Sequence, residues 1–118
     1  MLRKRCEMKD IFKEHLYGGS GFVNIFSTIQ NQAELNDHAT ALCVLTIPPG
    51  SEIAHHQHKG DMEVYFLLSG SGVFYDNDDR VVMEKYDAGF TYDGEYHGFM
   101  NIGDVPAEML CLIIPNKK

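Results

Sequence analysis

Short runs of apolar residues recur along most of this chain, and several of them alternate with polar residues. Alternation predicts a β-strand with one buried face, and a short continuous apolar run predicts a strand buried on both faces. Helical spacing occurs once, at Lys9–Leu16, where Gly18 and Gly19 would end a short helix. The predicted strands are Phe22–Ile29, Ala39–Ile47, Glu52–His58, Glu63–Leu68, Gly72–Tyr75, Arg80–Met83, His97–Asn101 and Ala107–Ile114.

Turn signals separate these runs at regular spacing. Glycine, proline, asparagine and aspartate favour turns because they supply the backbone angles or the local hydrogen bonds that turns need. Many short strands with turns between them predict an all-β protein, a sandwich or a barrel. We expect an N-terminal segment at residues 1–21, which carries the short helix, followed by one barrel domain at residues 22–118. The turn signals are Pro48-Pro49-Gly50, Lys59-Gly60-Asp61, Ser69-Gly70, Asp76-Asn77-Asp78-Asp79 and Gly103-Asp104.

Composition and charge narrow the possible partners. The chain has 118 residues, enough for one domain with a modest core, and its formal net charge is -7. An acidic surface repels phosphates, so we expect neither nucleic acid nor an anionic membrane as a partner. The basic start at residues 1–5 has no apolar stretch after it, which argues against a secretory signal and favours a cytoplasmic protein. Three cysteines at irregular spacing, Cys6, Cys43 and Cys111, are expected to be free thiols.

Histidines gather at the end of one predicted strand. His56 and His58 alternate with Gln57, so both imidazoles would lie on the same side of that strand, with His55 on the other side. A turn then brings back the next strand, which Glu63 opens, and His97 opens a later strand. Each residue alone has an ordinary explanation, as a solvated histidine pair, a surface carboxylate or a hydrogen-bonded core histidine. The spacing of the whole set favours a metal site.

This spacing resembles the two sequence motifs of the cupin family. In the first motif, Gly50 is followed by five residues, His56-Gln57-His58, four residues, Glu63, six residues and Gly70. In the second, Gly94, His97 and Asn101 fall in register, while Tyr86 and Tyr92 stand where the family has glycine and proline. The resemblance covers roughly residues 39–114.

The resemblance implies a double-stranded β-helix, or jelly roll, that carries one divalent transition metal. The implied ligands are His56, His58, Glu63 and His97. Nitrogen and oxygen donors without thiolate suit Mn, Fe, Co, Ni, Cu or Zn. Four protein ligands in an octahedral shell leave two positions for a substrate, water or O₂.

Alternation from the ligands predicts what lines the pocket. Tyr65, Leu67, Phe99 and Asn101 should lie on the ligand side, together with Ala54. Tyr65 is the nearest candidate for a catalytic group, although packing is the commoner role of a tyrosine, and Tyr92 and Tyr96 could lie at the rim. No lysine or arginine falls in the middle of a predicted strand, which argues against a dicarboxylate decarboxylase or a sugar-phosphate isomerase.

Three predicted strands are apolar on both faces, namely Leu42–Leu45, Val64–Leu68 and Met109–Ile114. A second subunit would cover the outer faces, so we expect a homodimer, unless these residues pack only within the chain. The leading hypothesis is a metal-dependent enzyme of the dioxygenase, lyase or isomerase type that acts on a small organic molecule. The alternative is a non-catalytic cupin module that binds or senses a small ligand, and both need a metal and an apolar pocket.

Overall fold

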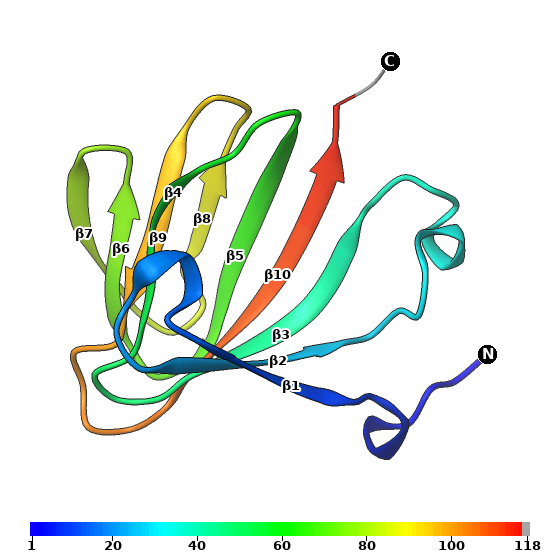
Figure 1. Ribbon diagram of the computed structural model, residues 1–118, viewed down its shortest axis with the longest axis horizontal. Coiled ribbons are helices and arrows are strands. Elements are labelled where there is room, and N and C mark those ends of the chain that lie inside the picture. Colours follow the sequence, from blue (N-terminus) through cyan, green and yellow to red (C-terminus); the bar gives the residue numbers. More distant parts are fainter. Residues whose placement is uncertain (117–118) are drawn as a thin grey trace.

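The structure is a computed structural model that describes residues 1–116, and its chain is built almost wholly from β-strands (Figure 1). Three short 3₁₀ turns, η1, η2 and η3, lie at Arg5–Glu7, Leu16–Gly18 and Gln32–Leu35. The strands are β1 (Asp10–Glu14), β2 (Phe22–Ser27), β3 (Ala41–Ile47), β4 (Glu52–Gln57), β5 (Asp61–Ser69), β6 (Gly72–Asp76), β7 (Asp79–Met83), β8 (Ala88–Thr91), β9 (Tyr96–Met100) and β10 (Ala107–Pro115).

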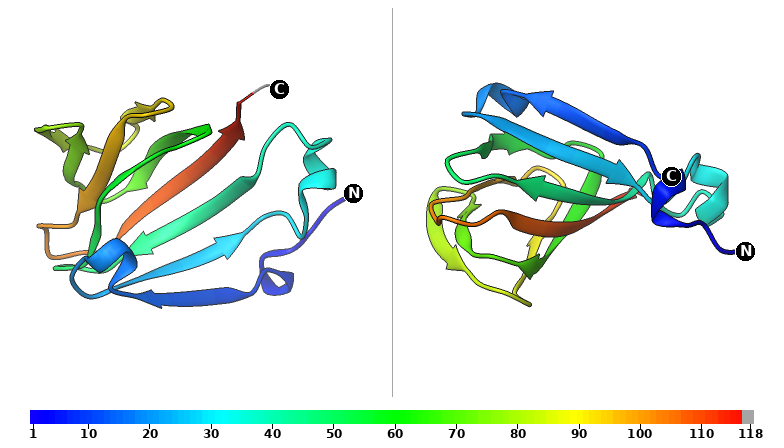
Figure 2. Two further views of the ribbon diagram at one scale, coloured as in Figure 1. Left: turned by 45° about the horizontal axis from the view of Figure 1, so that its top comes forward. Right: turned by 90° about the horizontal axis from the view of Figure 1, so that it is seen from below.

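The strands form two sheets that face each other (Figure 2). One sheet has six strands in the order β1-β2-β3-β10-β5-β8, and the other has four in the order β4-β9-β6-β7. Every neighbouring pair within these sheets is antiparallel. This is the predicted jelly-roll arrangement, but in the described part of the chain the hydrogen bonds do not close it into one continuous barrel.

All eight strands expected from the apolar pattern are confirmed, with ends that differ by no more than about two residues. The helix expected at Lys9–Leu16 is wrong, because Asp10–Glu14 forms β1 and pairs with β2. All five residues of β1 are exposed, so Ile11 and Phe12, which suggested a buried helical face, do not belong to the core. The strand β8 was not predicted, because its four residues are too short for a period to show.

The core lies between the two sheets and draws on almost every strand. Alternating residues of β3, β5 and β10 point inward to it, which explains why Leu45, Leu67 and Met109 are almost completely buried. The buried cluster comprises Val23, Leu45, Ile47, Ile53, Tyr65, Leu67, Phe74, Met83, Phe99, Ala107, Met109 and Cys111.

The outer face of the six-stranded sheet is apolar as well. Outward residues of β5, β10 and β3 lie opposite one another in the strand register, and they continue onto β8 and β2. Phe90 on β8 is 51% exposed, whereas Val44 near the centre of this face is buried by its neighbours. The two rows across this face are Phe90, Val64, Leu112 and Leu42, and Phe66, Leu110, Val44 and Phe26.

Two positions of the cupin motifs, Gly70 and Tyr86, have a left-handed backbone conformation. Gly70 has a φ of 79°, and a Cβ there would lie 2.8 Å from the Cα of Ala107, so only glycine fits after β5. Tyr86 stands where the cupin motif has glycine, and it keeps the left-handed backbone with a φ of 72°. Its ring stacks on Phe66 with centroids 6.0 Å apart.

None of the helices that the structure describes is long and apolar enough to cross a membrane.

Candidate metal centre

Two connections at one end of the sandwich bring the predicted ligands together. His56 lies on β4, and Glu63 on β5 comes back beside it after the β4–β5 turn that carries His58. His97 on β9 is the register partner of His56, which places the two rings on the same face. Figure 1 shows the β4–β5 and β8–β9 connections at the same end of the molecule. All four predicted residues therefore meet, although they come from three strands and a turn.

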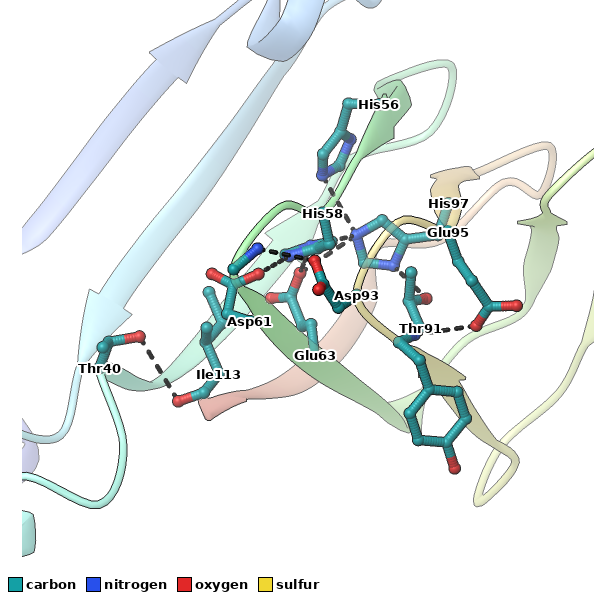
Figure 3. A network of polar contacts seen from close by, with 12 residues as sticks. Thr40, His56, His58, Asp61, Glu63, Thr91, Asp93, Glu95, His97 and Ile113 are labelled. Atoms are coloured by element: carbon teal, nitrogen blue, oxygen red, sulfur yellow. Dashed lines mark hydrogen bonds and ion pairs between the residues drawn. The ribbon is translucent and has the colours of Figure 1, made fainter. Parts of the chain in front are cut away.

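The donor atoms of these residues converge on one point (Figure 3). Nε2 of His97 is 3.0 Å from Nε2 of His58 and 3.1 Å from Nε2 of His56. Oε1 of Glu63 is 2.8 Å from Nε2 of His58 and 3.1 Å from Nε2 of His97. The ligand atoms of the four residues all lie within 4.8 Å of one another.

These spacings can be compared with those of a coordination shell. For a metal–nitrogen distance of about 2.1 Å, neighbouring donors lie about 3.0 Å apart in an octahedron and about 3.4 Å apart in a tetrahedron. The four shortest separations between donor atoms of different ligands, 2.8 to 3.1 Å, match the octahedral value. The residues present therefore fit a divalent ion that would keep two further positions beyond these four ligands.

The second nitrogen of each imidazole already has a partner. Nδ1 of His58 is 2.6 Å from Asp61, and Nδ1 of His56 lies 2.7 Å from the carbonyl oxygen of Ala54. Nδ1 of His97 is 2.9 Å from the hydroxyl of Thr91. These contacts orient the rings and leave Nε2 of each histidine to face the common point, which is the usual support of metal-binding histidines.

The protons of the cluster are distributed unequally. Hydrogen bonding to Glu63, with help from Asp61, raises the pKa of His58 to about 9. Burial lowers the pKa of His56 to about 4, and its two histidine neighbours add to the effect. Burial alone would raise the pKa of Glu63, but hydrogen bonds with His58 and His97 hold it below its usual value. A buried carboxylate is thus kept charged by a neighbouring imidazolium.

The turn before His97 forms despite its departure from the cupin motif. The amide of Tyr92, at the position of the family's proline, donates to Oε1 of Glu95 at 2.9 Å, a bond that proline could not make. The amide of Glu95 donates back to the carbonyl of Tyr92, and the amide of Gly94 donates to the carbonyl of His58. The turn is thus tied to the histidine strand.

Of the residues predicted to lie on the ligand side, three are buried in the core and Ala54 is not turned inward. Tyr65, Leu67 and Phe99 are buried as expected. Ala54 does not take the inward position, because the register of β4 shifts between Ile53 and His56. One extra residue in β4 at this bulge turns Ile53 inward, and Ile53 is 1% exposed.

Asn101 is fully buried, but its amide is used to hold loops. Nδ2 donates to the carbonyls of Ile47 and Val105, and Oδ1 accepts from the amide of Gly103. These backbone groups lie at the end of the sandwich opposite to the cluster, where β3 and β9 end (Figure 1), so Asn101 is not on the ligand side as predicted, and its role is to hold three backbone groups in place.

Tyr65 lies directly against the cluster. Its ring stacks on His97 with centroids 4.4 Å apart and an angle of 22° between the planes. Burial and the charge of Glu63 raise the pKa of Tyr65 well above its ordinary value, so the hydroxyl stays protonated.

The other side chains near the rim point elsewhere. His55 faces away as predicted, with its ring stacked on Tyr96 and Nε2 2.7 Å from the carbonyl of Asn77. Tyr92 is 57% exposed and Tyr96 is 41% exposed. In the described part of the chain, the ion pairs and ring contacts of arginine and lysine are made away from the cluster.

All three cysteines are free, as expected. Cys111 is buried on β10 and is the register partner of Cys43 on β3, while Cys6 is exposed. A hydrogen bond from Cys111 lowers the pKa of the Cys43 thiol, and burial raises the pKa of Cys111 well above its ordinary value.

Three residues around the site were not found from the sequence. Asp61 lies three positions after His58, and the sequence pattern gave it a local role in the predicted turn Lys59-Gly60-Asp61, whereas in the structure it is the first residue of β5. Thr91 is on the unpredicted β8, and Tyr17 lies in the N-terminal segment, far from the motif. The ring of Tyr17 stacks on His56 with centroids 3.7 Å apart and an angle of 9° between the planes. Proximity in space was the only signal for the last two.

Together, a jelly-roll sandwich and a cluster of three histidines and one glutamate at one end define a class of small β-proteins with a site able to hold a metal. The family described as "Cupin domain" matches residues 43–113, which is more than half of the chain. The protein belongs to the cupin family.

Known proteins agree with this assignment. An "Oxalate-binding protein" of Thermotoga maritima is 35% identical over 100 residues, which is 85% of this chain and 82% of that protein. A crystal structure from Thermotoga maritima, described as a predicted oxalate decarboxylase, has a TM-score of 0.92 and 31% identity, with 98% of this chain and 100% of that chain covered. A cupin 2 conserved barrel domain protein from Rhodopseudomonas palustris shares the fold at 11% identity, with a TM-score of 0.76 and coverage of 94% and 74%.

Proposed function

We propose that this protein is a metal-dependent enzyme that acts on a small carboxylate held at the site of His56, His58, Glu63 and His97. The observation that carries the proposal is the convergence of three Nε2 atoms and one carboxylate oxygen at separations of 2.8 to 3.1 Å. Because each Nδ1 is already engaged, the rings are set for a divalent Mn, Fe, Co, Ni, Cu or Zn ion.

A bound ion would supply a Lewis acid that holds an anionic ligand and stabilises negative charge that develops on it. Three neutral imidazoles and one carboxylate leave the site with a net charge near +1 when such an ion is present. An anion is therefore the complementary ligand, and the relative described as an oxalate-binding protein supports a small carboxylate.

Tyr65 supports a catalytic role within this proposal. It lies on His97 and is 2% exposed, and its hydroxyl remains protonated at neutral pH. Such a protonated phenol can donate a hydrogen bond to a bound substrate. The reaction classes that fit are dioxygenase, lyase and isomerase chemistry, all of which need a metal and a mostly apolar pocket.

The second candidate is a module that binds a carboxylate without turnover. It is favoured because three arginines make contacts away from the cluster and do not clamp a substrate there. Arg3 pairs with Glu34, and Arg5 pairs with Asp10. The guanidinium of Arg80 lies over the ring of Tyr75. A substrate with a second carboxylate would thus meet tyrosines at the site rather than a guanidinium.

Metal content tests the first part of the proposal. Protein purified without chelator should carry about one equivalent of a transition metal, and the His56→Ala, His58→Ala double variant should carry almost none. His55→Ala is the matched control, because His55 is adjacent in sequence but faces away from the cluster. A double variant that kept a full equivalent would overturn the ligand assignment.

Calorimetry and turnover separate the two candidates. Metal-loaded protein should bind oxalate, and the metal-free protein should bind it much more weakly. O₂ uptake and product analysis with oxalate, catechols and 2-oxo acids would then show a reaction if the protein is an enzyme. Tight oxalate binding without any product would favour the binding module.

We also propose a homodimer. The two apolar rows on the outer face of the six-stranded sheet span neighbouring strands without a charged residue among them. A second copy of the chain would remove this face from water, and apolar patches on a protein surface often mark such protein–protein interfaces.

A further inference from the structure

One aromatic ring from outside the sandwich lies on the candidate metal centre. Tyr17 belongs to η2, in the connection between β1 and β2, and its ring is nearly parallel to that of His56. The centroid separation of 3.7 Å is a full stacking contact. Tyr17 is 61% exposed, and His56 is half-buried. Because the two rings are stacked, the phenol covers part of His56 on the side that faces solvent.

The turn that carries Tyr17 is held in an unusual conformation. His15 and Tyr17 have φ values of 51° and 55°, which non-glycine residues rarely adopt. The amide of Gly18 donates to the carbonyl of His15, and the amide of His15 donates to the carbonyl of Gly21. Strain of this kind persists where the surrounding structure enforces it, and it gathers at functional sites.

The turn is also anchored to the strand that carries His56. A Cβ at Gly19 would lie 2.5 Å from the carbonyl oxygen of Glu52, so the backbone of the turn lies directly against β4. Leu16 packs against the buried cluster from the same turn. The turn η2 packs against β4, and Figure 3 shows it as the pale-blue coil at the top, close to His56. The ring of Tyr17 is thus placed by the fold, and it does not hang freely from the surface.

The ring also lies near the acidic side of the cluster. Besides burial, the charges of Glu63 and Asp61 act on the hydroxyl of Tyr17 and raise its pKa. The charge of an ionised Tyr17 in turn contributes to the raised pKa of Tyr65, whose ring is stacked on that of His97. Two tyrosines that are far apart in the sequence therefore flank the histidines, Tyr17 on His56 and Tyr65 on His97.

We propose that Tyr17 is a specificity-determining residue that limits the ligand of the metal centre to short carboxylates. Its ring occupies space beside His56 into which a longer carboxylate would extend. This inference rests on the proposed function, because it assumes that a carboxylate binds at the four-residue cluster. The ring, rather than the hydroxyl, is the part that excludes longer ligands.

The test compares oxalate with succinate, which carries two more methylene groups between its carboxylates. Calorimetry on Mn²⁺-loaded protein should show the native chain binding oxalate at least 100-fold more tightly than succinate. Tyr17→Ala should reduce this preference at least tenfold, chiefly through tighter succinate binding. Tyr17→Phe should keep the native preference, because the ring remains.

The control is Tyr86→Ala, which removes another exposed tyrosine with a positive φ that stacks on an aromatic ring, Phe66, far from the site. It should leave the preference unchanged. The absorption spectrum of bound Co²⁺, recorded without carboxylate, should be the same for Tyr17→Ala and the native chain. Circular dichroism would confirm that each variant is folded.

Several outcomes would overturn the inference, and they are distinguishable. An unchanged preference in Tyr17→Ala would show that the ring does not limit ligand size. Loss of the Co²⁺ spectrum in Tyr17→Ala would show that the ring only holds His56. Failure of the native Mn²⁺ protein to bind either carboxylate would reject the proposed function itself, and the inference with it.

Discussion

At the scale of single residues, the site depends on a proton held between His58 and Glu63. The pKa of His58 is raised to about 9, so its imidazole is protonated at neutral pH when no metal is bound. His56, with a pKa of about 4, is neutral there. A metal ion needs unprotonated imidazoles and would therefore compete with one proton across the neutral range.

This competition predicts the pH dependence of metal affinity. Between about pH 7 and pH 9, the affinity for Mn²⁺ or Co²⁺ should rise about tenfold per pH unit, because binding releases one proton from His58. Above about pH 9 the rise should level off, since His58 is then already neutral. Calorimetric titration at a series of pH values in a buffer that does not bind the metal would measure the slope.

The origin of the raised pKa can be tested in the metal-free protein. In Glu63→Gln, the pKa of His58 should fall well below 9, because the carboxylate that stabilises the imidazolium is lost. An NMR titration of the His58 ring measures this directly. A pKa of His58 that stayed near 9 would mean that Asp61 alone is responsible.

Asp61 gives a second prediction at the residue scale. Its carboxylate is 2.6 Å from Nδ1 of His58, so Asp61→Asn should weaken metal binding by about 10- to 100-fold without removing a ligand. Asp104→Asn, at an exposed turn, should bind metal like the native protein. Equal affinities for both variants would show that Asp61 does not support the site.

At the scale of elements, the site depends on the register of β4, β5 and β9. The apolar pattern was enough to predict these strands, because alternation is a local property of the sequence. It could not predict the bulge between Ile53 and His56, which depends on how β4 pairs with β9. The bulge changes which residues line the pocket, while His56 and His97 stay opposite each other.

The end of β5 gives a prediction about stability. Gly70→Ala should lower the free energy of unfolding by about 3 kcal/mol, because alanine is strained at a positive φ and its Cβ would overlap Ala107. Gly103→Ala should cost far less, since a Cβ there meets only Oδ1 of Asn101 at 3.4 Å. Urea denaturation of both variants gives the comparison.

At the scale of the whole molecule, the apolar outer face of the six-stranded sheet predicts self-association. Phe90→Glu should convert the proposed dimer to a monomer, because a charge on this face could not be buried against a second copy. Val82→Glu is the matched control, because Val82 is an exposed apolar residue on the other sheet, at 64% against 51% for Phe90. Light scattering coupled to gel filtration would measure the mass, and a native chain that is monomeric would refute the prediction.

By itself, the sequence determined the strand positions and an all-β sandwich or barrel, because alternation and turn signals are local properties of short stretches. The jelly-roll class and the four residues of the cluster followed from the resemblance of two short motifs to those of the cupin family, whose fixed spacings need no knowledge of distant contacts.

Only the tertiary structure decided the rest. It replaced the expected helix at Lys9–Leu16 by β1, since β2 offered a free edge for pairing. It gave each histidine its own Nδ1 partner, and it placed Tyr17 against His56. These outcomes bring together segments that are remote along the chain, and a local pattern carries no information about such meetings.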